Sequence, residues 1–114
     1  SMYQNIPFDD LDKPLEWPDE IPAEARINST VLSIDKQPAS TDGFQYEYHV
    51  VALMNDDLVA ELERILNHYD SKDLMNVKIN ESFVFICGNA ENIKWLKEDK
   101  RNGDAVEFIY YKNE

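Results

Sequence analysis

The sequence predicts an α+β two-layer sandwich, with two helices on one face of a mainly antiparallel sheet of four or five strands, and a proline-rich acidic N-terminal arm. Three observations support this fold class. Apolar residues alternate with polar ones in several short stretches, as in half-buried strands. They recur every three or four residues in two other stretches, as in amphipathic helices. The predicted order is strand, strand, helix, one or two strands, helix and strand, which is typical of an α+β domain.

Residues 1–25 are predicted to form the arm, and residues 26–114 a single domain. The arm contains four of the five prolines, a density that forbids a long helix or a central strand. Most of the charged residues in the arm are Asp or Glu. Apolar side chains such as Phe8 and Trp17 lie between these acids, so the arm can either pack on its own domain or become ordered on a partner.

Two strands are expected next. Residues 26–35 form the first, with Leu32 and Ile34 on one face, and a polar loop follows at residues 36–43. Residues 44–54 form a longer strand that pairs with the first as a hairpin. One face of this second strand carries Phe44, Tyr46, Tyr48, Val50, Ala52 and Met54, and the other begins with Gln45, Glu47 and His49.

The first helix is predicted to start at Asn55-Asp56-Asp57, because short acceptor side chains cap free amides and acids suit the positive helix end. It should end near Tyr69 or Asp70. Its apolar stripe consists of Leu58, Leu62, Ile65, Leu66 and Tyr69.

The apolar run from Phe83 to Cys87 is predicted to be a central strand that is buried on both faces. Its lone thiol should therefore be a buried apolar group rather than a reactive one. Val77 and Ile79 indicate a short strand before this run, although residues 77–87 can also form one bent strand.

Asn89 is predicted to cap the second helix, with Ala90, Ile93 and Leu96 or Lys97 on its inner side. Gly103 is well placed for the left-handed conformation that often follows a helix end. Residues 105–111 then form the last strand, in which Val106, Phe108 and Tyr110 face one way and Glu107, Ile109 and Tyr111 face the other.

The chain is strongly acidic, with 23 Asp and Glu residues against 11 Lys and Arg residues and a formal net charge of −12. Such a protein is repelled by nucleic acid phosphates and by anionic membranes, and it is attracted to basic proteins. The single cysteine cannot form an intramolecular disulfide, and no apolar run is long enough to span a membrane. We therefore expect a cytoplasmic protein with neither a nucleic acid nor a membrane as its direct partner.

No motif for catalysis or cofactor binding is present. His49 and His68 are the only histidines, and no third residue accompanies them at metal-ligand spacing. Three glycines are too few for a glycine-rich phosphate loop. We therefore expect no metal, no cofactor and no enzymatic activity.

The expected function is that of a small acidic inhibitor, which binds and occludes a basic nuclease, toxin or nucleic-acid-binding complex. Toxin-neutralising immunity proteins and phage-encoded antagonists of bacterial defence share this size and charge, an analogy at the level of class alone. The alternatives are a small enzyme or metabolite-binding domain that uses His49 and strand tyrosines, and an adaptor subunit of a larger assembly. The expected partner-binding residues are Asp9, Asp10, Asp12, Glu16, Trp17, Asp19, Glu20, Tyr46, Glu47, Tyr48 and Tyr111.

Overall fold

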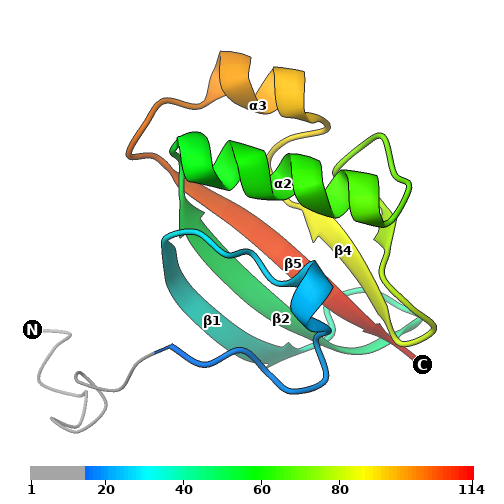
Figure 1. Ribbon diagram of the computed structural model, residues 1–114. Helices are drawn as coiled ribbons and strands as arrows, with labels where there is room; N and C mark the ends of the chain where they lie inside the picture. Colours follow the sequence, from blue (N-terminus) through cyan, green and yellow to red (C-terminus); the bar gives the residue numbers. More distant parts are fainter. Residues whose placement is uncertain (1–14) are drawn as a thin grey trace, which may run out of the picture.

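A computed structural model of the protein describes residues 15–114 as a five-stranded antiparallel sheet with two α-helices on one face (Figure 1). The strand order is β1-β2-β5-β4-β3. The strands are β1 (Val31–Pro38), β2 (Phe44–Leu53), β3 (Val77–Lys78), β4 (Phe83–Cys87) and β5 (Ala105–Asn113), and the helices are α2 (Asp56–His68), α3 (Ile93–Asp99) and the short 3-10 helix η2 (Ala23–Ala25). The predicted α+β class is confirmed, and residues 77–87 form two strands rather than one.

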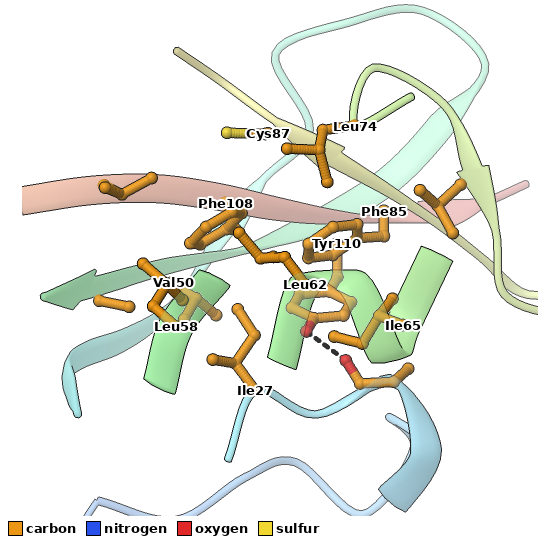
Figure 2. Close-up of a cluster of buried hydrophobic side chains, with 14 of the residues drawn as sticks. Ile27, Val50, Leu58, Leu62, Ile65, Leu74, Phe85, Cys87, Phe108 and Tyr110 are labelled. Carbon is orange, nitrogen blue, oxygen red and sulfur yellow. Dashed lines mark hydrogen bonds between the residues drawn. The ribbon is translucent and has the colours of Figure 1, made fainter. Parts of the chain in front are cut away.

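The core lies between the sheet and α2. Alternate residues of β2, β4 and β5 point toward the helices, and α2 meets them with its predicted apolar stripe. Figure 2 shows Phe85, Phe108 and Tyr110 gathered in this layer, where the first two rings stack with centroids 5.5 Å apart. The strand residues buried on this side of the sheet are Tyr48, Val50, Ala52, Val77, Phe83, Phe85, Cys87, Val106, Phe108 and Tyr110.

The helix starts follow from asparagine caps. The side chain of Asn55 accepts a hydrogen bond from the backbone N–H of Leu58 at 2.8 Å, and α2 begins where the sequence predicted. The second helix starts later than predicted, because Asn92 rather than Asn89 caps α3 by accepting from the N–H of Trp95. Residues 88 and 89 instead form a turn, and the backbone N–H of Leu74 donates a hydrogen bond to the carbonyl oxygen of Glu91 at 2.6 Å.

The prediction that residues 83–87 form a central strand, buried on both faces, was wrong. β5 is the middle strand, and β4 lies between it and the two-residue β3 at the sheet edge. Phe83, Phe85 and Cys87 are buried, but Val84 and Ile86 on the other face are half-exposed. The apolar run therefore reflects a strand with apolar side chains on both faces. Within residues 15–114, only the face toward the helices is covered.

The first strand also differs from its prediction. β1 begins at Val31 instead of residue 26 and continues through Pro38, which had been assigned to the loop. The pairing with β2 shifts between Val31 and Ser33, so Leu32 is an extra residue in a bulge and is 51% exposed. A proline is tolerated here because β1 is an edge strand.

Residues 17–27 pack on the helix-covered side of the sheet. Ile21 and Ala25 are fully buried, and the Trp17 ring meets the Tyr110 ring edge-on at a centroid distance of 5.8 Å. The hydroxyl group of Tyr110 donates a hydrogen bond to the carbonyl oxygen of Ala25 at 2.5 Å, drawn as the dashed line in Figure 2. Arg64 of α2 also donates to the backbone carbonyls of residues 24 and 26. The second half of the predicted arm is thus part of the folded core.

Candidate functional site

The face of the sheet opposite α2 and α3, here called the open face, is the main surface on which candidate residues gather. Within residues 15–114 no helix packs against it, as Figure 1 shows. The strand register places on it Ser33, Asp35, Gln37, Glu47, His49, Val51, Leu53, Lys78, Val84, Ile86, Glu107, Ile109 and Tyr111. Two of the predicted partner-binding residues, Glu47 and Tyr111, are direct cross-strand neighbours there.

One part of the open face is an apolar block formed by β4 and β5. Val84 lies opposite Tyr111, and Ile86 lies opposite Ile109, so these four side chains occupy adjacent positions. The ring of Phe44 extends the block, with its centroid 4.7 Å from that of Tyr111. Val84, Ile86 and Tyr111 remain partly exposed, so they form a continuous apolar surface that faces solvent.

Beside this block lies a cluster of carboxylates around His49. Glu47 is only 1% exposed, and its Oε1 accepts hydrogen bonds from the backbone N–H of Ser40 at 2.8 Å and from its hydroxyl group at 3.0 Å. The Oε2 atom of Glu47 contacts Nε2 of His49, whose Nδ1 is 3.9 Å from Oε2 of Glu107. Asp35 lies opposite His49 on β1.

The Glu47 network fixes the loop between β1 and β2 over the open face. Burial alone would raise the pKa of Glu47, but the hydrogen bonds from Ser40 and the nearby His49 together lower this pKa from its usual value of 4.5. The ionised form is therefore favoured in the folded state. Because three donors converge on one buried carboxylate, the loop and the imidazole ring are held in fixed positions.

This network predicts a loss of stability in acid. A depressed carboxyl pKa stabilises the folded state above pH 4.5, and that contribution disappears as the pH falls through the lower folded-state value. Replacing Glu47 with Gln should cost about 1–3 kcal/mol near pH 7, because one acceptor is lost in a buried network. Urea unfolding from pH 7 to pH 3 should show a flatter pH dependence for this variant than for the parent.

The exposed neighbour Glu107 supplies the matched control. Its side chain is 47% exposed and its contact with His49 is long, so Glu107→Gln should change stability by less than ~0.5 kcal/mol. Equal losses in the two variants would mean that Glu47 does not anchor the loop.

A second cluster lies on the helix-covered side and holds the segment before η2. Glu20 accepts hydrogen bonds from the hydroxyl groups of Tyr46, at 2.6 Å, and Tyr48. The bond to Glu20 is the main cause that raises the pKa of Tyr46 to about 12, while burial is the main cause that raises the pKa of Tyr48. The ammonium group of Lys36 lies 4.0 Å from the centre of the Tyr46 ring. These predicted binding residues therefore contact one another, while the Glu20 side chain remains exposed at the surface.

The structure thus separates the predicted site residues. Glu47 and Tyr111 lie on the open face, whereas Glu20, Tyr46 and Tyr48 form the cluster on the opposite side. Glu16 and Asp19 are exposed, Trp17 is half-buried against Tyr110, and Asp9, Asp10 and Asp12 lie outside the described residues. Sequence reasoning missed His49, Glu107 and Asp35 as neighbours, since only the strand order brings β1, β2 and β5 together.

Two hollows lie on the helix side. One, of about 370 Å³, is bordered by Met54, Val59, Glu63, Lys97 and Lys100, and the other, of about 450 Å³, lies between residues 17–28 and α2. Neither hollow includes His49. Within residues 15–114, no group of three or more His, Cys, Asp or Glu side chains is arranged to hold a metal ion. In the same range, no helix has both the length and the apolar character needed to cross a membrane.

No protein family, curated protein or solved structure matches this chain. Function must therefore be inferred from the surfaces and charges described above.

Proposed function

We propose that this protein is a small acidic inhibitor that binds a basic protein partner, such as a nuclease, a toxin or a nucleic-acid-binding complex, and acts by occlusion rather than by catalysis. The observation that supports the proposal is a large negative charge that the fold does not neutralise. Within residues 15–114, ion pairs involve only five carboxylates, which are Glu47, Glu61, Glu63, Glu98 and Glu107. The remaining acids leave a field that attracts cationic surfaces.

The proposed mechanism has two steps. The negative field first steers a basic partner and raises the rate of encounter. The bound protein then covers a surface with which the partner would otherwise contact phosphate groups. Binding should be specific for basic proteins, since phosphate-bearing nucleic acids are repelled by a chain of net charge −12.

The test identifies the partner and then measures its activity. Immobilised protein retains a basic protein from a lysate of the source cells, and the purified partner is assayed for nucleic acid binding with and without a stoichiometric amount of this protein. We expect the partner's nucleic acid binding to be lost. We also expect the association rate to fall at least ~10-fold between low and high salt, because steering is screened.

Two variants provide the charge control. Replacing the exposed acids Glu16 and Asp19 with Gln and Asn should slow association, whereas Lys94→Gln, which removes a cation that is 85% exposed, should not slow it. Glu20 is left unchanged because it binds the two tyrosines. A partner that keeps full activity when saturated, or a gel shift of bare DNA by this protein alone, would refute the proposal.

A second candidate function is a small enzyme or metabolite-binding domain, and one observation favours it. The pairing of His49 with the buried Glu47 resembles the carboxylate–histidine pairs that orient an imidazole for proton transfer. The other ring nitrogen faces Glu107 at 3.9 Å. This alternative predicts that His49→Gln abolishes an activity while leaving partner binding intact.

A further inference from the structure

We infer that the open face is the docking surface for the partner, and that the partner contacts it with a basic amphipathic segment. This inference rests on the function proposed above. The segment is expected to place apolar side chains on Val84, Ile86, Ile109 and Tyr111, and Lys or Arg side chains beside Asp35 and Glu107. Binding there would give the sheet a second covering layer.

The apolar block supplies the centre of such an interface. Its four residues form two adjacent cross-strand pairs in β4 and β5, and the Phe44 ring adds to one end. Burying apolar surface contributes roughly 25 cal/mol per Å² removed from water. Interfaces have an apolar centre and a polar rim, and tyrosine is enriched in them. This arrangement matches a binding surface better than a solvated sheet face, on which polar residues would be expected.

The rim of the block is negative on one side. Asp35 is exposed on β1, and Glu107 is 47% exposed on β5 next to the apolar residues. The buried Glu47, which accepts hydrogen bonds from Ser40, holds His49 between Asp35 and Glu107. The exposed carboxylates of Asp35 and Glu107 therefore remain able to accept hydrogen bonds from a cation. Lys78 on β3, opposite Val84, is the only Lys or Arg residue that the register places on this face within residues 15–114, so the exposed carboxylates of Asp35 and Glu107 outnumber it. Charge complementarity therefore favours a cationic partner.

Other occupants fit this surface less well. A second copy of the chain would bring two molecules of net charge −12 face to face, which like-charge repulsion opposes. Addition of a strand to the edge of β1 is discouraged by the bulge at Leu32, by Lys36 and by Pro38. The contact is therefore expected through side chains on the open face.

The experiment uses a helical Leu/Lys amphipathic peptide as the probe, with a Leu/Glu peptide of the same pattern as its control. Methyl NMR spectra of the full chain should show saturable shifts of Val84, Ile86 and Ile109 with the cationic peptide only. Charge-reversal variants distinguish a local effect of this surface from an effect of the net charge alone. Asp35→Lys and Glu107→Lys should each weaken binding at least ~10-fold, whereas Asp99→Lys on α3, which changes the net charge equally, should weaken it less than ~2-fold.

Several outcomes would overturn the inference. They are shifts confined to α2 and α3, equal effects of the Asp35 and Asp99 variants, or a concentration-dependent dimer that buries the open face. A thermal melt checks each variant, and Asp35→Lys remains informative if Glu107→Lys does not fold, because Asp35 is exposed on an edge strand. If a basic partner is captured and inhibited but Asp35→Lys binds it normally, the proposed function stands and this surface is excluded. If the peptide binds the open face but no basic partner is inhibited, only the proposed function fails.

Discussion

A chain that begins at Arg26 is expected to lose its cooperative unfolding transition. Removing the preceding residues takes away the fully buried Ile21 and Ala25, together with the Trp17 ring that contacts Tyr110. It also removes the carbonyl oxygen that accepts the hydrogen bond of the Tyr110 hydroxyl group. Large buried side chains typically contribute ~2–5 kcal/mol each when they are truncated. The total loss therefore approaches the whole stability of a typical domain, ~5–15 kcal/mol.

Thermal and urea unfolding monitored by circular dichroism measure this effect. Single substitutions give the graded control: Ile21→Ala should cost ~2–5 kcal/mol, and the exposed Asp19→Asn should change stability by no more than ~0.5 kcal/mol. A shortened chain that melts at the temperature of the full chain would contradict this account, because it would mean that the segment before Arg26 is dispensable to the core.

The second large effect is expected for Phe85→Ala. Phe85 is fully buried, stacks on Phe108, and lies with its ring centroid 4.9 Å from that of Tyr110. Figure 2 shows Phe85 among the side chains buried between the sheet and α2. Its truncation should leave a cavity there and lower the free energy of unfolding by ~3–5 kcal/mol. Urea titration followed by tryptophan fluorescence measures this loss directly.

The adjacent residue on the same strand provides the comparison. Val84 points to the open face and is half-exposed, so Val84→Ala should cost no more than ~1 kcal/mol. Similar losses in the two variants would show that β4 is buried on both faces, as the sequence first indicated. A large loss at Phe85 alone supports the one-sided core.

Local signals were sufficient to predict most elements of this fold. Asn55 followed by two aspartates predicted the start of α2, because a capping side chain and the backbone N–H that donates to it lie within one turn. The alternation of the two faces from Phe44 to Leu53 predicted β2, because this signal also lies within one short stretch of the chain. The start of α3 was predicted wrongly because both Asn89 and Asn92 can cap a helix. The choice between them depends on a backbone hydrogen bond from the N–H of Leu74 to the carbonyl oxygen of Glu91.

Long-range arrangement could not be predicted in the same way. Val84 and Ile86 would be apolar whether a helix or solvent covered them, so the sequence does not indicate that this face of β4 is exposed. For the candidate site, Glu47 and Tyr111 were identified from their strands, but their pairing depends on β5 lying between β2 and β4. The hydrogen bonds that the two strand tyrosines donate to Glu20 likewise join residues that are distant along the chain.

The place of β5 in the sheet has a consequence for biosynthesis. The middle strand is also the last of the five strands in sequence order, and its pairing with β2 joins residues as far apart as Phe44 and Asn113. Until β5 has left the ribosome, β2 and β4 each present an unpaired edge, and the two halves of the sheet cannot join. Such non-local pairing slows folding and exposes nascent chains to aggregation. The sheet is thus expected to form only once β5 is available, with β5 closing it in the final step.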